Sequence, residues 1–206
     1  MRMLYGKFVI LMLGLTVLTA TTPALARRHA QRFTLSESCT LPHPPTTTIS
    51  LTGAQATVDF SPEGGGTALI LKALAAARHS IRVQAYSFSD RRILTALGQA
   101  KARGVDVRVI LDKTDAESYE HHQPVAAVIA AEGIPVWIDA SVRIAHNKLM
   151  IIDGNDLITG SYNFTYSAAH YNAENLLYIR NATALVKAYI ANWNWRQSCA
   201  KSYSSH

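Results

Sequence analysis

The sequence predicts an α/β protein with a mixed, mostly parallel sheet flanked by helices on both faces. Between residues 54 and 138, short runs rich in Val and Ile alternate with Ala/Leu-rich runs of helical periodicity. This alternation of strand and helix is typical of parallel strands joined by right-handed crossovers. The later half adds a hairpin, one more strand and a last helix. No internal repeat is visible, and 206 residues suffice for a single domain with a real core.

The first half supplies most of the expected elements. We expect strands at 56–60, 80–88, 105–111 and 134–138, and helices at 67–78, 90–103 and 125–132. The run 80–88 alternates apolar and polar side chains, which indicates a strand. Gly104 and Gly133 follow two of the helices, where a left-handed cap residue is expected. The polar stretch 113–123 is expected to be a loop.

The second half changes character. Strands are expected at 148–152 and 157–159, because Asp153-Gly154-Asn155 between them is a hairpin turn signal. A polar stretch at 161–172 precedes a strand at 175–179 and a helix at 182–196. These elements complete one sheet sandwiched between helices.

Residues 1–26 have the layout of a secretory signal peptide. Arg2 and Lys7 precede an apolar run at 8–18, and Ala24-Leu25-Ala26 places small residues at a cleavage site. The run of about eleven residues is short of the roughly 20 that span a bilayer, so we expect no membrane anchor after cleavage. Cleavage after Ala26 would leave 180 of 206 residues and lower the formal charge from +6 to +4. We therefore expect a periplasmic or secreted protein, mildly basic, whose charge permits a polyanionic partner without proving one.

The mature chain divides into a lead-in and a folded domain. Residues 27–53 are basic and proline-rich and are expected to be irregular, whereas 54–206 hold the regular pattern. Cys39 and Cys199 lie near the two ends. In an oxidising compartment the simplest outcome is one disulfide closing almost the whole chain, and the alternative is two unpaired thiols.

One segment concentrates residues that can do chemistry. His146 and Lys148 are two apart where a strand is expected to begin, so their side chains should point to one face. The hairpin returns Ser161 and Asn163 toward that strand. An imidazole can attack phosphorus near pH 7 without a metal, and ammonium, hydroxyl and amide donors stabilise negative non-bridging oxygens. A second, protonated imidazole suits the leaving alkoxide. The mixture therefore suits a phosphodiester.

These residues resemble the phospholipase D superfamily. Its signature His-x-Lys-x4-Asp-x6-Gly-Ser-x-Asn is matched at every fixed position, by His146, Lys148, Asp153, Gly160, Ser161 and Asn163. The segments 60–62, 83–88, 104–109 and 172–176 also resemble the small bacterial EDTA-resistant endonucleases of that superfamily, often called Nuc. The resemblance covers about residues 56 to 197.

The resemblance implies the phospholipase D/nuclease fold and a role for each residue of the motif. His146 would be the nucleophile that forms a phosphohistidine, while Lys148, Ser161 and Asn163 would hold the phosphate. Glu174 matches the acid that orients and charges the histidine; the plainer alternative is a solvated acid at a strand start. The candidate catalytic set is thus His146, Lys148, Asp153 and Glu174, although Asp153 is expected to support the hairpin rather than touch substrate. No metal or cofactor is expected.

The number of motifs bears on assembly. The family mechanism uses two motifs, with one histidine attacking while its counterpart protonates the leaving group. This sequence has one His-x-Lys pair. A homodimer would place two copies of His146 across a two-fold axis, and the resemblance implies this arrangement for small members.

Three functions remain open at this stage. The first is an exported, non-specific endonuclease acting on DNA or RNA; the second is a phospholipase D acting on phospholipid headgroups. The third is a nucleic-acid-binding module with a catalytically dead version of the fold. Among other histidines, His121-His122 suits a surface loop better than a metal site, and His170 suits the cleft or the surface equally.

Overall fold

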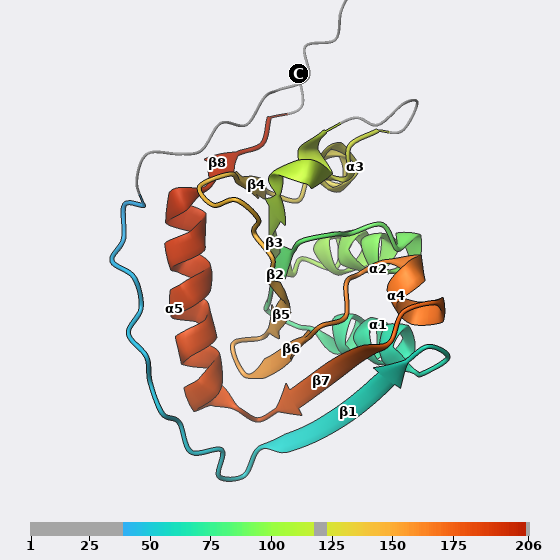
Figure 1. Ribbon diagram of the computed structural model, residues 1–206, viewed down its shortest axis with the longest axis vertical. Coiled ribbons are helices and arrows are strands. Elements are labelled where there is room, and N and C mark those ends of the chain that lie inside the picture. The colour runs from blue at the N-terminus through green and yellow to red at the C-terminus, as the bar shows by residue number, and fades with distance from the viewer. Residues whose placement is uncertain (1–38, 118–122, 205–206) are drawn as a thin grey trace, which may run out of the picture.

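The computed structural model describes residues 39–117 and 123–204, which form one eight-stranded sheet with helices on both faces (Figure 1). The expected signal peptide and His121-His122 lie outside the described residues. The strands are β1 (Gln55–Ser61), β2 (Ser80–Ala85), β3 (Asp106–Asp112), β4 (Val136–Asp139), β5 (Lys148–Ile152), β6 (Asp156–Gly160), β7 (Glu174–Arg180) and β8 (Lys201–Ser202). The helices are α1 (Gly66–Ala76), α2 (Arg91–Ala102), the 3-10 turn η1 (Lys113–Ala116), α3 (Val125–Ala131), α4 (Tyr166–His170) and α5 (Thr183–Cys199).

The sheet is mixed, as predicted, but the expectation that it is mostly parallel is wrong. Its strand order is β1-β7-β6-β5-β2-β3-β4-β8. Only the pairs β2–β3 and β3–β4 are parallel, because α2 and α3 carry the chain back between them. The other five pairs are antiparallel. A short turn joins β5 to β6, and residues 161–173, which include α4, join β6 to β7. The loop after β4 returns the chain to insert β5 beside β2.

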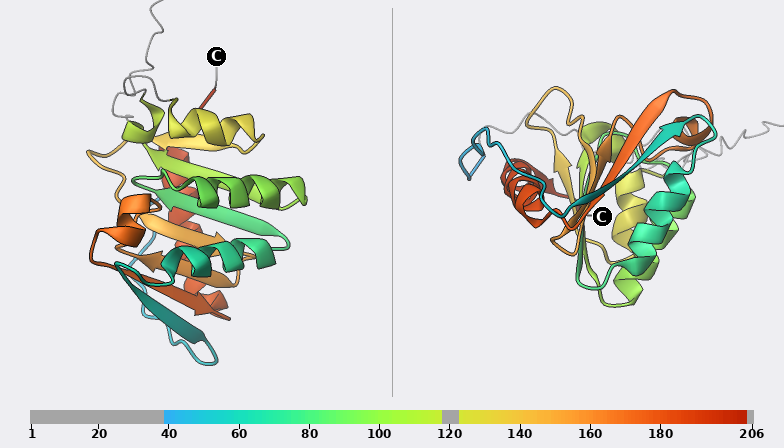
Figure 2. Two further views of the ribbon diagram at one scale, coloured as in Figure 1. Left: turned by 90° about the vertical axis from the view of Figure 1, so that its right-hand side faces the viewer. Right: turned by 90° about the horizontal axis from the view of Figure 1, so that it is seen from below.

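The helices cover the two faces unequally. Figure 2 shows α1, α2 and α3 on one face and α5 alone on the other. The main core lies under the three helices, where side chains such as Ile70, Leu97 and Val109 are fully buried. A smaller core lies under α5 around Leu157, Val186 and Trp193. Helix α5 leaves β1 largely uncovered, since Val58 and Phe60 remain 55% and 66% exposed.

The two ends of the described chain are joined covalently. Cys39 and Cys199 form the predicted disulfide. Beside it, the backbone N–H of Leu41 donates to Ser198 Oγ at 3.2 Å, and the ring of His43 packs on Trp195. From there the chain runs along the outside of α5 to β1 (Figure 1). The disulfide thus ties the N-terminal segment to the last turn of α5.

The sequence pattern did not predict three short elements: η1, which lies in the stretch 113–123 expected to be a loop, and also α4 and β8. Helix α4 has five residues and lies inside the stretch expected to be a polar loop; Thr165 caps it by accepting from the Ala168 N–H. Strand β8 has two residues and extends the sheet beside β4. All three are too short to show a period of 3.6 or 2, so periodicity could not predict them.

Candidate active site

The candidate residues gather at one end of the sheet, which we call the catalytic end: β1, β2, β3 and β6 finish there, and β5 and β7 begin there. The pairing register sets this arrangement. Lys148 opens β5 opposite Ala85, the last residue of β2. Glu174 opens β7 opposite Ser61, the last residue of β1. Ser161 follows directly after β6. In Figure 2, left, the loop before β5 and helix α4 lie at this same end.

His146 lies in the loop before β5, outside the strand, and its side chain is exposed. The loop is anchored near the histidine by the buried carboxylate of Asp112, which accepts the Ala145 N–H at 2.7 Å. Lys113 Nζ donates to the carbonyls of Val142 and Arg143, at 3.3 and 2.7 Å. The residues after β3 therefore fix the backbone that presents the imidazole.

Lys148 is buried, unlike His146, so strand alternation does not extend to the histidine as expected. Its Nζ donates to the backbone carbonyl of His146 at 2.9 Å and lies 5.1 Å from the ring centroid of Tyr86. The same ring packs against the imidazole of His146, with centroids 4.5 Å apart. Burial lowers the pKa of Lys148, while Glu174 opposes this effect by its negative charge. Tyr86 thus stands between the two motif side chains.

Ser161 and Glu174 are joined directly. Ser161 Oγ donates to Glu174 Oε2 at 2.6 Å and accepts from the Asn175 N–H at 3.0 Å. Asn172 Nδ2 donates to the other carboxylate oxygen at 3.1 Å, and the Glu174 N–H donates to Ser61 Oγ. Both oxygens of Glu174 are therefore engaged, and no hydrogen bond joins this residue to His146. Its role toward the histidine stays a prediction.

Asn163 has an unused polar atom. Its side chain is half-buried, and Oδ1 has no hydrogen-bond partner among the described residues. A buried amide group without a partner is costly unless a ligand or water engages it. The carboxamide of Asn163 thus has a buried acceptor that no described residue satisfies, and its role toward a phosphate stays a prediction.

Asp153 lies away from the other candidates. It occupies the β5–β6 turn at the opposite end of the sheet, in the left-handed region at φ 52°. Its carboxylate accepts the N–H groups of Arg78, His79 and Ser80, at 2.9, 2.7 and 2.9 Å. Burial acts to raise its pKa, but these three donors hold it below the usual value. The structure thus brings together His146, Lys148, Ser161 and Glu174 and leaves Asp153 as a structural tie between β2 and the hairpin.

The sequence reasoning assigned no role to four residues that shape the site: Tyr86, Asp112, Asn172 and Asn175. Tyr86 follows β2, Asp112 is the last residue of β3, and Asn172 and Asn175 lie just before and just inside the start of β7. A polar or aromatic side chain just beyond the carboxyl end of a parallel strand is the signal that could have found Tyr86 and Asp112.

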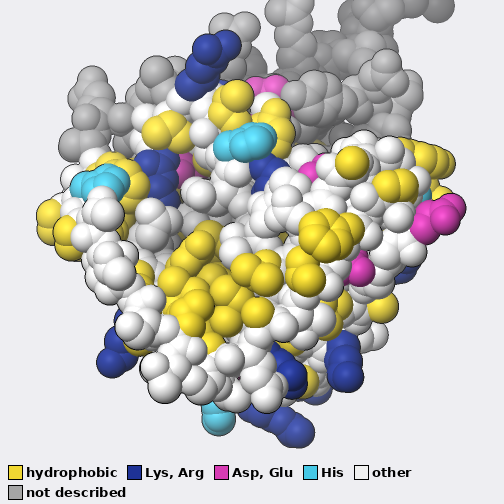
Figure 3. Space-filling model, turned by 60° about the horizontal axis from the view of Figure 1, so that its bottom comes forward, with side chains coloured by type: hydrophobic (Ala, Val, Ile, Leu, Met, Phe, Trp, Pro, Cys, Tyr) yellow, Lys and Arg dark blue, Asp and Glu magenta, His cyan; other side chains and the backbone are white. Residues whose placement is uncertain are grey.

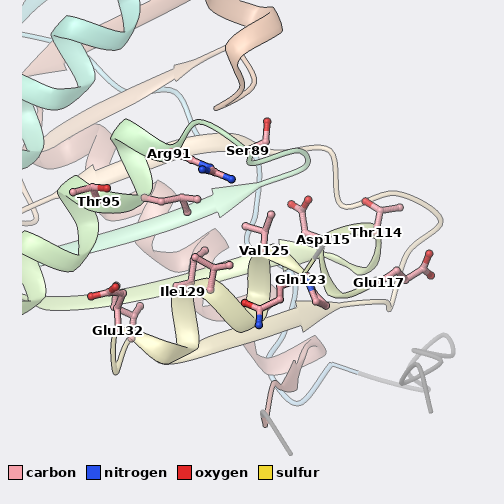
Figure 4. Close-up of a pocket in the computed structure, with 14 residues that line it drawn as sticks. Ser89, Arg91, Thr95, Thr114, Asp115, Glu117, Gln123, Val125, Ile129 and Glu132 are labelled. Atoms are coloured by element: carbon pink, nitrogen blue, oxygen red, sulfur yellow. The ribbon is translucent and has the colours of Figure 1, made fainter. Parts of the chain in front are cut away.

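A separate cavity of about 760 Å³ lies between α2, η1 and α3 (Figure 4). Leu94, Val125 and Ile129 form part of its apolar wall, and Arg91 and Asp115 also line it. No residue of the His-x-Lys motif takes part. Asp115 Oδ2 has no hydrogen-bond partner within the described ranges, and burial raises the pKa of this carboxyl to about 7. The cavity therefore excludes the motif residues, although η1 follows β3 directly and so begins at the catalytic end.

The sequence comparisons point to one superfamily. The family described as "Cardiolipin synthase, PLD-like domain" matches residues 70–196. A protein called "Phospholipase D" from Rickettsia prowazekii is 40% identical over 148 residues, 69% of this chain and 68% of that protein. A "Mitochondrial cardiolipin hydrolase" from Mus musculus is 33% identical over 137 residues, 66% of this chain and 60% of that protein. The chain thus spans about two thirds of the length of these relatives.

Solved structures agree with this assignment. Nuc from Salmonella typhimurium, described as a phospholipase D family member, has a TM-score of 0.67 and 37% identity, covering 74% of this chain and 99% of that one. NucT from Helicobacter pylori has a TM-score of 0.63 at 19% identity, over 73% and 99% of the two chains, and shows the fold alone. The motif is matched at every fixed position, and the family model and relatives agree with it, so the chain belongs to the phospholipase D superfamily of phosphodiesterases.

Proposed function

We propose that this chain is an exported, metal-independent endonuclease that hydrolyses nucleic acid through a phosphohistidine, with an active site shared by two copies. The observation that carries the proposal is the convergence of His146, Lys148, Ser161 and Glu174 at the catalytic end. An exposed imidazole beside the buried ammonium of Lys148 and the exposed hydroxyl of Ser161 suits attack on a phosphate that arrives from solvent.

In the first half of the reaction, a ring nitrogen of His146 attacks phosphorus. A phosphorus–nitrogen bond forms, and the bond from phosphorus to one ester oxygen breaks. The departing oxygen takes a proton from the imidazolium of His146 in the second copy. Lys148, Ser161 and Asn163 donate to the non-bridging oxygens, so the hydroxyl of Ser161 must turn from Glu174 toward the phosphate.

In the second half, water attacks phosphorus. The imidazole of the second copy, now neutral, takes a proton from that water, and the phosphorus–nitrogen bond breaks. Both histidines return to their starting states. Glu174 would favour the cationic form of an imidazole that approaches it, as opposite charges do at short range.

The test is cleavage of plasmid DNA in EDTA by the mature protein. We expect His146→Ala to abolish cleavage and His79→Ala, an exposed histidine at the opposite end of the sheet, to retain it. Quenching in alkaline detergent during turnover should trap a phosphate adduct on the wild type that survives base and is lost in acid, and none on His146→Ala. A wild type that binds DNA but neither cleaves it nor forms this adduct is a binding module instead.

A phospholipase D acting on lipid headgroups is the second candidate, supported by the names of the Rickettsia and mouse relatives. The same bond-making steps serve either diester. Among the described helices none is long and apolar enough to cross a membrane. A parallel assay of DNA, RNA and phosphatidylcholine vesicles, all in EDTA, separates the candidates; release of headgroup without nucleic acid cleavage would select the second.

Export is proposed from the sequence of residues 1–26. Mass spectrometry of the protein recovered from a periplasmic extract or culture medium should give a chain beginning at Arg27. Recovery of the uncleaved chain from the cytoplasm would contradict export without affecting the catalytic proposal.

A further inference from the structure

Exposed hydrophobic side chains are concentrated around the catalytic end. Figure 3 shows hydrophobic patches on one face of the molecule, with His, Lys and Arg side chains among them. The described residues include eight large hydrophobic side chains that are exposed, and five of them belong to segments adjoining the site: Val58 (55%), Phe60 (66%), Ile144 (45%), Tyr166 (54%) and Tyr171 (72%). Clustering of this kind marks a binding surface, since isolated exposed hydrophobics need no explanation.

Three rings form a packed group on one side of the site. The ring of Tyr166 lies 4.2 Å from His170 and 5.7 Å from Tyr171, measured between centroids. Tyr171 directly precedes Asn172, whose Nδ2 donates to Glu174. Ala168, in the same short helix, is buried in the core beneath α1–α3. Tyr171 is therefore next in sequence to the residue that donates to Glu174, and the three rings lie on the face of the sheet that α1–α3 cover.

Phe60 lies on the other side. In the β1–β7 register it stands opposite Asn175, and paired residues share one face of the sheet. Leu176 points into the core of the three helices, so Asn175 and Phe60 lie on the α5 face. Asn175 Nδ2 is 3.3 Å from Ser161 Oγ. Exposed rings therefore flank the Ser161–Glu174 pair on both faces.

We propose that Phe60 and the group Tyr166, His170 and Tyr171 stack the two nucleobases next to the bound phosphate, and so select single-stranded over duplex nucleic acid. The proposal rests on the proposed function. A phosphodiester carries a nucleoside on each side, and unpaired bases can turn a face toward a ring, whereas paired bases in a duplex cannot. Stacking tolerates any sequence, which fits a non-specific enzyme.

Two features favour bases over lipid chains as the occupant. Three of the four rings carry a polar group, a hydroxyl or an imidazole, and they pack on one another in a fixed arrangement. The rings also adjoin the groups that would hold the phosphate, which is where an attached nucleoside must lie.

The experiment compares three substrates in EDTA: a labelled single-stranded oligonucleotide, the same sequence as a duplex, and bis(p-nitrophenyl) phosphate. We expect the wild type to favour the single strand, and Phe60→Ala and Tyr171→Ala each to raise KM for it about tenfold. Rates on the duplex and the small diester should stay within about twofold, because neither offers a free base to the rings. Tyr171→Phe should match the wild type, since it retains a ring.

Val128→Ala, which truncates an exposed hydrophobic side chain on α3, is the matched control. Its kinetics on all three substrates should equal those of the wild type. Single-strand kinetics unchanged in both ring variants, or a wild-type preference for duplex, would overturn the inference while leaving the endonuclease proposal intact. If Phe60→Ala and Tyr171→Ala lose binding to phosphatidylglycerol vesicles but keep wild-type kinetics on the oligonucleotide, the rings bind lipid and not nucleobases. A wild type that cleaves the small diester but no nucleic acid would instead refute the proposed function.

Discussion

Asp115 illustrates how the fold changes a single side chain. It follows β3 in η1, lines the cavity beneath α2 and α3, and has one carboxylate oxygen without a partner among the described residues. Burial raises its pKa from 3.8 to about 7; the Phe88 N–H partly offsets this rise, and the nearby charge of Asp112 adds to it. The folded protein therefore holds this acid neutral at pH values where the unfolded chain ionises it.

This shift predicts a pH dependence of stability. Between about pH 4 and 7 the folded state retains a proton that the unfolded state releases, so stability falls as pH rises through this window and stays low above it. In Asp115→Asn this contribution is absent. From pH 4.5 to 8 we expect the wild type to lose about 3 kcal/mol more unfolding free energy than the variant.

Urea unfolding at pH 4.5, 6 and 8 measures the difference. Glu132→Gln removes an exposed carboxylate from the same cavity and should follow the wild type. Parallel curves for the wild type and Asp115→Asn would show that this carboxyl does not titrate as inferred.

At the scale of elements, the loop between β4 and β5 decides where His146 stands. Its start is tied to α5, because Arg196 forms a buried ion pair with Asp139 and donates to Ser141 Oγ at 2.9 Å. Its end is held by Asp112 through the Ala145 N–H. The loop carrying the nucleophile is therefore positioned by a strand terminus and by a helix on the far face of the sheet.

We predict that Asp112→Asn lowers kcat for bis(p-nitrophenyl) phosphate, because one carboxylate now serves two groups of donors, at Thr114 and at Ala145. An amide cannot accept with both of its terminal atoms. Small displacements of a reacting group can cost about a hundredfold in rate, so a fall of about ten- to a hundredfold is expected with KM little changed.

Thr114→Val is the control, since it removes only the hydroxyl bond to Asp112 Oδ1 and leaves the Ala145 contact. Circular dichroism and thermal unfolding would establish that both variants are folded at the assay temperature. Equal kcat in folded Asp112→Asn and wild type would show that the loop is positioned without this bond.

At the scale of the whole molecule, the single motif makes one copy half of the proposed site. This predicts a dominant effect when wild type and His146→Ala are mixed and allowed to exchange subunits. If each site needs both histidines, an equal mixture retains about a quarter of the wild-type activity, because only that fraction of dimers is fully wild type. If each subunit acted independently, the same mixture would retain about half of the wild-type activity.

Sedimentation analysis at assay concentration should accompany the mixing experiment. The His79→Ala variant, mixed in the same ratio, should leave the activity at its starting level. An active monomer, or half activity in the His146→Ala mixture after exchange, would contradict the shared site.

Much of this molecule follows from local sequence. The alternation at 80–88, the glycine after the second helix and the turn at 153–155 each encode their element within a few residues, and β2, α2 and the β5–β6 hairpin formed where expected. The motif spacing was sufficient to identify the family, because the chemistry requires these residue types. Cys39 and Cys199 also paired as their number and positions indicated.

Only the tertiary structure decided which strands are neighbours and which side chains meet. Strand pairing depends on packing between segments far apart in the chain, so the order that makes the sheet mostly antiparallel has no local signal. The same pairing puts Asp153 at the opposite end from His146, and brings Tyr86 and Asp112 to the histidine from other strands. The sequence by itself determined the chemistry and the local elements; their convergence at one end of the sheet was decided by long-range packing.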